Sequence, residues 1–232
     1  GQKIILQGGL ADMTTLFERQ LEELHVLLIT MGGLCEKAIS LSAKAVQEQG
    51  EREIVKEIFE TDKEIDERER EIEAHCMRLL LHQHPVARDL REVSAALKMI
   101  SDMERIGDQA ADIADISFYI RKDVKIPAKI QEMAEHTVHM VTESVDAFVN
   151  TDLALCRKVI EDDDLVDDCF NGIKEELAKL IYGAELDARA GLDLLMTAKY
   201  FERIGDHAVN IAEWVEYSIT GEHRNNEHQL NV

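Results

Sequence analysis

One short motif occurs twice in this chain. MERIGDQAADIAD occupies residues 103–115 and FERIGDHAVNIAE occupies residues 201–213, so that ERIGD recurs about a hundred positions later. Glu104 corresponds to Glu202 and Asp108 to Asp206, with the same spacing for both pairs. A run that mixes acidic, basic, apolar and glycine residues does not easily recur by chance. The repeat therefore predicts a chain built from two copies of one supersecondary unit.

The repeated unit is predicted to be helical. Apolar residues recur at spacings of three and four, which is the period of an amphipathic helix. With 2 prolines and 12 glycines in 232 residues, few positions break a helix. In the first stripe the apolar residues are Phe17, Leu21, Leu24, Leu28, Met31, Cys35 and Ala38. We therefore predict an all-α protein without a sheet.

The breaks between stripes divide the chain into six helices. Gly50 and Pro85 end the first two stripes, and the third, which ends at Phe118, is followed by the break RKDVKIP around Pro127. Helices four to six are expected at about 127–150, 152–181 and 187–219. We predict two homologous antiparallel three-helix bundles, 13–122 and 123–221, joined near residues 122–126. Residues 1–12 and 222–232 are expected to be flexible termini, and Met13 is a candidate natural start.

Composition excludes several classes of function. The formal net charge of −21 repels the phosphate backbone of nucleic acids, so nucleic-acid binding is not expected. We find no apolar run approaching the eighteen residues of a membrane span and no secretory signal. Cys35 and Cys76 fall on apolar helical positions and are interpreted as buried thiols in a reducing compartment. These features predict a soluble, cytoplasmic protein.

Carboxylates occupy positions where the helical pattern requires apolar residues. Glu104 lies in the third stripe, and three residues later Gly107 costs about 1 kcal/mol relative to alanine within a helix. Glu202 and Gly205 repeat this arrangement. A carboxylate that faces inward must be paired or must bind a cation.

The preceding helix of each half carries a matching acidic pair. In each half, the acidic pair and the Glu and Asp of the ERIGD motif make a quartet of carboxylates. Residues at one level of an antiparallel helical hairpin are equidistant from its turn. The mean residue number of the first quartet falls at Pro85 and that of the second beside Gly183, and both positions lie in predicted turns. The four carboxylates of each half are therefore predicted to meet across the hairpin as a metal site with oxygen ligands only. Such ligands suit Mg²⁺, Mn²⁺ or iron better than the thiolate and imidazole ligands that are typical of structural zinc sites. The eight candidate ligands are Asp62, Asp66, Glu104 and Asp108 in the first half, and Asp163, Asp167, Glu202 and Asp206 in the second.

The alternative is that these carboxylates form ordinary solvated faces, as most acidic pairs on charged helices do. A ferritin-like di-iron centre is rejected, because only Glu22 and His25 have the Glu-x-x-His spacing on a suitable helix. One difference separates the two halves: Asn210 stands where the first half has Asp112. The two sites are therefore expected to differ in occupancy or nuclearity.

The segments LLITMGGLCEKAI, ERIGDQAADIA and ERIGDHAVNIAEWV resemble the PhoU family of bacterial phosphate-transport and phosphate-signalling regulators. The resemblance runs from about residue 16 to residue 220. It implies two three-helix bundles and multinuclear metal clusters, iron among them, on the paired acidic motifs, and it places these clusters on the eight residues above. Iron is favoured by the resemblance, with Mn, Mg or Zn as alternatives.

The resemblance also implies a function without catalysis. A PhoU-like protein is expected to link the ATPase subunit of the phosphate ABC transporter to a phosphate-sensing histidine kinase and to repress the phosphate-starvation response. Membrane contact would be peripheral and through these partners, and a homodimer is implied. Two alternatives stay open: an accessory of a different phosphate carrier, and a metal-dependent phosphohydrolase in which the clustered cations activate water.

Overall fold

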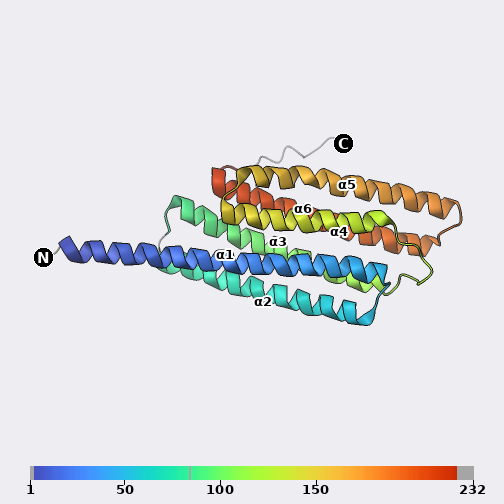
Figure 1. Ribbon diagram of the computed structural model, residues 1–232, viewed down its shortest axis with the longest axis horizontal. Coiled ribbons are helices and arrows are strands. Elements are labelled where there is room, and N and C mark those ends of the chain that lie inside the picture. Colours follow the sequence, from blue (N-terminus) through green and yellow to red (C-terminus); the bar gives the residue numbers. More distant parts are fainter. Residues whose placement is uncertain (1–2, 84, 224–232) are drawn as a thin grey trace.

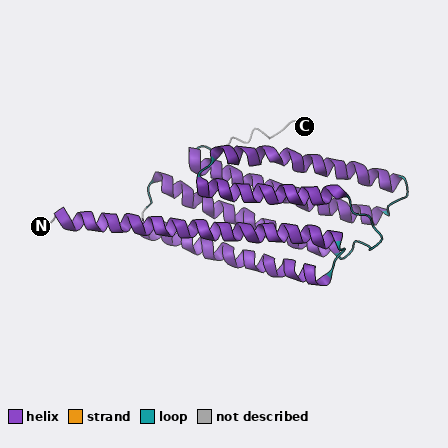
Figure 2. Ribbon diagram, in the orientation of Figure 1, coloured by secondary structure: helices purple, strands orange, loops and turns teal. Residues whose placement is uncertain are grey.

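The computed structural model describes the backbone of residues 3–83 and 85–223, and their side chains from Leu16 onward except at 82 and 83. Within these ranges the ordered elements are helices, and no strand occurs (Figures 1 and 2). The predicted all-α class is confirmed. The six helices are α1 (Lys3–Gln47), α2 (Arg52–Gln83), α3 (Ala87–Ser117), α4 (Ala128–Asn150), α5 (Leu153–Tyr182) and α6 (Ala188–Thr220).

The helix ends follow from local sequence chemistry. Gly50 adopts a φ of 76° in the α1–α2 turn, and Gly221 ends α6 with a φ of 78°. The Asp152 side chain caps α5 by accepting a hydrogen bond from the backbone N–H of Leu155 at 3.0 Å. These bounds agree with the predicted breaks to within a few residues. α1 reaches back to Lys3, through the segment expected to be flexible.

The two halves repeat one another in hydrogen bonding as well as in sequence. In α1 the Ser42 hydroxyl lies 2.7 Å from the carbonyl oxygen of Ala38 and 3.2 Å from that of Ala110 in α3. In α4 the Ser144 hydroxyl lies 2.6 Å from the carbonyl oxygen one turn earlier and 3.4 Å from that of Ala208 in α6. Ala110 and Ala208 are corresponding positions of the two ERIGD segments. The repeat in the sequence therefore corresponds to a repeat in the three-dimensional structure.

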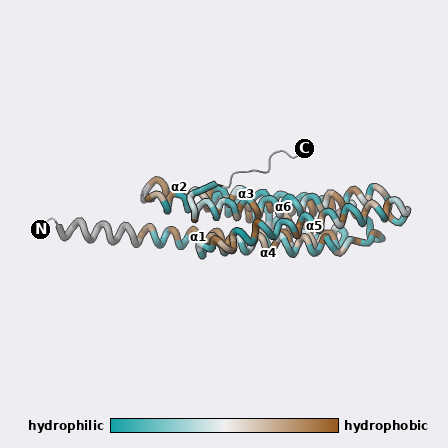
Figure 3. The backbone as a smooth tube through the Cα atoms, turned by 90° about the horizontal axis from the view of Figure 1, so that it is seen from above, coloured by the Kyte–Doolittle hydropathy of each residue, from teal (hydrophilic) through white to brown (hydrophobic). Residues whose placement is uncertain are grey.

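The halves pack side by side around one core. α1, α3, α4 and α6 form the centre, because α1 packs against α3 and α4, and α6 against the same two helices. α2 lies outside α1 and α3, and α5 lies outside α4 and α6 (Figure 1). Hydrophobic and hydrophilic residues are interspersed along the coloured part of the bundle (Figure 3), and the buried apolar residues of both halves form a single cluster. The two predicted bundles therefore pack directly against each other, through contacts of α1 with α4 and of α3 with α6.

One prediction about α1 was too strict. By length and composition alone, the segment Leu16–Gln47 could cross a membrane, whereas the sequence analysis expected no apolar segment of that length. The reason is that one window of 18 residues within this segment is apolar on average and contains at most two charged residues. Its apolar face packs against α2, α3 and α4, as in the core helix of a bundle.

Candidate functional site

Two glycines allow each outer helix to approach its ERIGD helix closely. A Cβ atom on Gly107 of α3 would lie 2.7 Å from Oδ1 of Asp62 and 3.1 Å from Cδ1 of Ile65, both on α2. In the second half, a Cβ atom on Gly205 would lie 3.1 Å from Oδ1 of Asp163 on α5. The glycine of each ERIGD motif therefore provides the space that an aspartate of the neighbouring helix occupies. This explains why a residue unfavourable within a helix stands in the motif twice.

The first quartet meets across the α2–α3 hairpin. Burial, followed by repulsion from Asp66 and Asp108, raises the pKa of Asp62 to about 6. The pKa of Glu104 is also raised, first by burial and then by repulsion from Asp108, with smaller contributions from Glu69 and Asp66. The Oδ1 atom of Asp62 is buried without a hydrogen-bond partner. An unpartnered buried carboxylate oxygen beside like charges favours a proton or a cation.

The second quartet meets in the same way between α5 and α6. Burial raises the pKa of Asp163 to about 7, with repulsion from Asp167, Asp206 and Glu202 adding to the effect. Burial and repulsion from Glu202 also raise the pKa values of Asp167 and Asp206. The four predicted carboxylates of each half therefore lie close enough to influence one another electrostatically.

Basic side chains reach both quartets. The Arg105 guanidinium contacts Asp108 at 2.9 Å and Glu104 at 3.6 Å, and its side chain is 61% exposed. In the second half Lys199 forms a close ion pair with Glu202, whose side chain is only 16% exposed. Among the described residues, no group of three or more His, Cys, Asp or Glu side chains is arranged to hold a metal ion. Cation binding at either quartet would therefore require its carboxylate side chains to rearrange.

The sequence analysis placed Glu104 on the buried stripe of α3, and this prediction is wrong in detail. Glu104 and Asp108 are half-buried at the edge facing α2, whereas Met103, Ile106 and Gly107 form the buried face. The difference arises because α3 packs against α1, α2 and α6, so its buried arc is wider than one stripe. The edge position suits a metal ligand, because it leaves the carboxylates open to solvent on one side.

Sequence reasoning missed Lys199, and it did not predict the contacts that Asp112, Asn210 and His207 make around the quartets. Repulsion from Asp112 contributes to the raised pKa of Asp62. Lys199 was missed because it lies outside the repeated motif, although its spacing of three residues before Glu202 is the signal for an ion pair within a helix. Asn210, the counterpart of Asp112, instead donates from its amide to Asp102 of α3 at 3.1 Å. The Nδ1 atom of His207 lies 2.9 Å from the same Asp102 oxygen.

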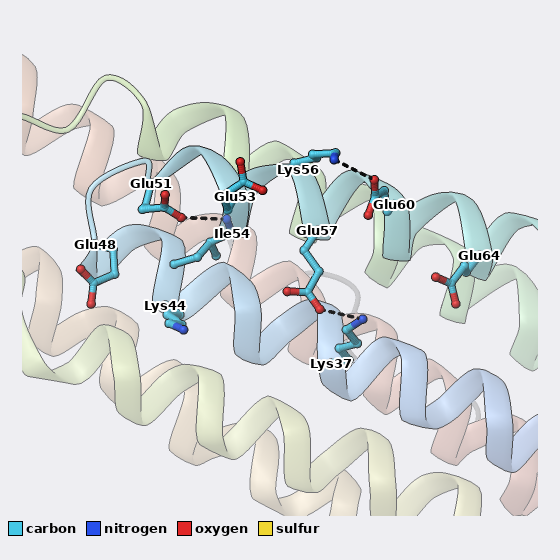
Figure 4. A pocket seen from close by; sticks show the side chains of 10 residues that line it. All are labelled: Lys37, Lys44, Glu48, Glu51, Glu53, Ile54, Lys56, Glu57, Glu60 and Glu64. Carbon is cyan, nitrogen blue, oxygen red and sulfur yellow. Dashed lines mark hydrogen bonds and ion pairs between the residues drawn. The ribbon is translucent and has the colours of Figure 1, made fainter.

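A groove between α1 and α2 lies apart from both quartets (Figure 4). Lys37 contacts Glu57 at 2.9 Å, and Lys56 contacts Glu60 at 3.7 Å within it. Ile54 is the apolar residue of a lining otherwise made of glutamate and lysine. This mutual neutralisation on an open surface is typical of a solvated charged face.

Replacing Gly107 with alanine is expected to destabilise the protein by about 1–3 kcal/mol, because the methyl group must displace Asp62 and Ile65 in a packed hairpin. Gly205→Ala should cost less, since its Cβ would meet Asp163 at 3.1 Å instead of 2.7 Å. Urea unfolding of both variants measures the difference. Equal stability of Gly107→Ala and the parent would show that the close approach is not required.

Comparison with known proteins places this arrangement in a family. The sequence pattern of the PhoU domain matches residues 28–117 and again residues 130–215, together more than half of the chain. The chain belongs to the PhoU family. The two matched segments coincide with the two halves of the repeat, so each PhoU domain contributes one three-helix unit and one carboxylate quartet.

Relatives within the PhoU family cover nearly the whole chain. A phosphate-specific transport system accessory protein PhoU homolog of Clostridium acetobutylicum is 35% identical over 209 residues, which are 89% of this chain and 95% of the relative. The phosphate-specific transport system accessory protein PhoU of Escherichia coli is 29% identical over 208 residues, covering 89% of this chain and 86% of that protein. The chain thus spans most of the length of these PhoU proteins.

Solved PhoU structures confirm the fold. The crystal structure of PhoU from Pseudomonas aeruginosa matches with a TM-score of 0.81 and 31% identity, covering 89% of this chain and 100% of that one. The phosphate transport system regulatory protein PhoU from Streptococcus pneumoniae matches with the same TM-score and 25% identity. The predicted family and the predicted pair of three-helix bundles are therefore confirmed.

Proposed function

We propose that this chain is a regulator of phosphate transport and phosphate signalling. It links the ATPase subunit of the phosphate ABC transporter to a phosphate-sensing histidine kinase and represses the phosphate-starvation response. The observation that carries the proposal is the nearly full-length match to proteins named as accessory or regulatory components of phosphate transport systems. Those names also support a role without catalysis.

The physical character of the chain is compatible with an adaptor. A charge of −21 suits docking to basic surfaces of partner proteins and repels nucleic acid. We place the protein in the cytoplasm, as a homodimer that reaches the membrane through its partners. The six helices share one continuous core, which gives an adaptor a rigid body on which both partners can act.

The proposed function includes metal binding at the two quartets. In the first half the proposal is supported by Oδ1 of Asp62, which is buried without a hydrogen-bond partner in the space that Gly107 leaves for the Asp62 side chain. A bound metal would offset the repulsion that raises the pKa values of Asp62 and Asp163, and would join the outer helix of each half to its ERIGD helix. Iron is favoured among the metals, with Mn, Mg and Zn as alternatives. Binding would add stability by mass action.

A complementation experiment tests the regulatory role. The chain is expressed in a bacterium that lacks its own PhoU and carries a reporter on a phosphate-starvation promoter. We expect the reporter to be repressed in phosphate-rich medium and released in phosphate-poor medium. An otherwise identical strain without the sensor kinase is the control. Full reporter activity in phosphate-rich medium, with the protein present at normal levels, would exclude this role.

Metal content is tested by elemental analysis of the purified chain after reconstitution. The double variant Glu104→Ala, Asp108→Ala is expected to lose the first site, because it removes both ligands that α3 contributes. If the two quartets bind equally, metal content falls by about half. Unchanged stoichiometry in the variant would show that the first quartet is not a metal site.

A further inference from the structure

We propose that one exposed face of α1 is a docking surface for a basic amphipathic helix of a partner protein. The surface consists of Val26, Ile29, Thr30 and Gly33 and is named the α1 face. The inference rests on the proposed adaptor function and deepens it, because it assigns a surface of the chain to a partner and states the chemistry of that partner. In the complex, the apolar side of the partner helix lies on the α1 face, and its lysine or arginine side chains meet glutamates of α1 and α2.

The first argument is the absence of charge on the α1 face. No Asp, Glu, Lys or Arg occurs in residues 24–35, which make about three turns of helix. Yet Val26 is 62% exposed, Ile29 is 49% exposed, and Thr30 and Gly33 are exposed as well. The Thr30 hydroxyl donates to the carbonyl oxygen of Val26 at 2.9 Å, so its hydrogen bond is made within the helix. The solvent side of these turns therefore offers apolar contact instead of charge.

The second argument comes from corresponding positions of the repeat. The matching serine hydrogen bonds of α1 and α4 align the two helices, and this alignment puts Gln131 in the place of Ile29 and Glu135 in the place of Gly33. The Gln131 amide donates to the Glu135 carboxylate at 3.1 Å on the exposed surface of α4. Residues 126–137, the counterpart of the uncharged stretch, contain one lysine and two glutamates. The fold therefore accepts a charged face at this place, and folding does not explain why the first half lacks one.

The third argument is the space in front of Gly33. Glycine within a helix is unfavourable relative to alanine, so an interior glycine needs a reason. Its neighbour Gly32 has one inside the molecule, because a Cβ atom there would lie 3.2 Å from Cγ2 of Val145 in α4. A Cβ atom on Gly33 would meet nothing within 4 Å. The distance between two packed helices depends on the side chains at their contact, so Gly33 allows a helix from outside to approach α1 closely.

The charge around the α1 face favours a basic partner. Two hollows follow the seam between α1 and α2: one of about 580 Å³ that contains Val26, and the groove shown in Figure 4. Nine glutamates and five lysines or arginines line the two hollows. Lys37, one turn after Gly33, is already paired with Glu57 of α2 at 2.9 Å. The surplus of glutamate gives the α1 face a polar rim, to which cationic side chains of a partner are complementary.

Other occupants match this rim less well. A second copy of the chain carries the same net charge of −21, and its α4 and α5 surfaces would bring further carboxylates. An anionic membrane surface is repelled by the same glutamates. A helix with leucine-like residues on one side and lysine or arginine on the other satisfies both the apolar face and the acidic rim.

The test is the binding of the full chain to two fluorescein-labelled synthetic helices at physiological salt. Both are about eighteen residues long and share one leucine face, and the opposite face carries lysine in one peptide and glutamate in the other. We expect the parent to bind the lysine peptide and not the glutamate peptide. The double variant Ile29→Gln, Gly33→Glu, which installs the residues of the second half, should weaken binding by about tenfold or more.

Gln131→Glu is the matched control, because it makes the same change of net charge at the exposed counterpart of Ile29. Binding by this variant should stay close to that of the parent. The double variant should fold, since both positions are exposed and glutamate suits a helix better than glycine. Equal weakening in the double variant and in Gln131→Glu would show a general charge effect and would overturn the proposal.

Two further measurements identify a different occupant. In analytical ultracentrifugation, a parent dimer that becomes a monomer in the double variant would assign the α1 face to a second copy. Binding of the parent to phosphatidylglycerol vesicles that is lost in the double variant would assign the face to a membrane. Either result would overturn the proposal, as would absence of binding between the parent and the lysine peptide.

The reporter strain separates this inference from the proposed function. At normal protein level, the double variant is expected to lose repression of the phosphate-starvation promoter in phosphate-rich medium. Equal repression by parent and double variant would overturn the docking surface and leave the regulatory role intact. If the parent itself does not repress, but its binding of the lysine peptide still depends on the α1 face, the regulatory role fails and the docking surface stands.

Discussion

Gly50→Ala is expected to destabilise the protein by roughly 2–5 kcal/mol. The first reason is conformational: with a φ of 76°, an alanine at this position costs about 1–2 kcal/mol. The second is steric, because a Cβ atom would lie 2.7 Å from Cα of Phe118 and 2.9 Å from the carbonyl oxygen of Ser117. These are backbone atoms at the end of α3, so the contact cannot be relieved by rotating a side chain, and overpacking adds about 1–3 kcal/mol.

The effect should extend to the connection between the halves. Beside Gly50, the Gln49 amide donates to the carbonyl oxygen of Val124 at 2.8 Å, and Lys122 donates to that of Glu48 at 2.5 Å. These bonds hold the segment between α3 and α4 against the α1–α2 turn. If the turn is displaced, we expect hydrogen exchange to increase in residues 118–127 as well as in the turn.

Gly33→Ala is the matched control for the same substitution. Gly33 lies within α1, and a Cβ atom there would meet nothing within 4 Å. Helix propensity then predicts a stabilisation of up to about 1 kcal/mol. Urea or thermal unfolding of both variants measures the contrast. Equal behaviour of the two variants would show that neither the backbone conformation nor the contact at Gly50 matters.

The sequence predicted the features that depend on local periodicity and on the repeat. The six helices follow from the spacing of apolar residues, and Gly50 and Pro85 fall in turns because neither residue suits a helix interior there. The proximity of Asp62 to Asp108 was predictable, because antiparallel helices place residues that are equidistant from the turn at the same level. The four buried cysteines are free, as expected for Cys35 and Cys76.

Features that depend on packing between the halves could not be predicted in this way. The contacts of α1 with α4 and of α3 with α6 arise from the shapes of two bundle faces, and periodicity does not encode them. For this reason Glu104 was predicted on the buried stripe instead of at its edge, and the contact of Asn210 with Asp102 was not foreseen. Lys199 could have been found by comparing the halves position by position beyond the motif.

The second large effect concerns pH. Asp62 and Asp163 have folded-state pKa values of about 6 and about 7, raised mainly by burial from the usual 3.8. Below about pH 3 both residues are largely protonated in the folded and the unfolded chain, and their shifts have almost no effect. As the pH rises from 4 to 7, the unfolded chain releases these protons first, so the folded chain holds more protons. The metal-free protein should therefore lose stability across this range.

Asp62→Asn tests the origin of this loss. The amide cannot ionise, so the variant should gain stability over the metal-free parent at pH 7.5 and differ little from it at pH 3. Glu67→Gln, an exposed position on the same helix, controls for the change of net charge. Mn²⁺ added at pH 7.5 should stabilise the parent, because a cation offsets the repulsion among the ionised carboxylates, and should stabilise Asp62→Asn less. Urea unfolding at the two pH values, with and without Mn²⁺, gives all of these comparisons. A constant difference between Asp62→Asn and the parent at both pH values would show that the ionisation of Asp62 does not limit stability, and the metal would then have no such repulsion to relieve at this residue.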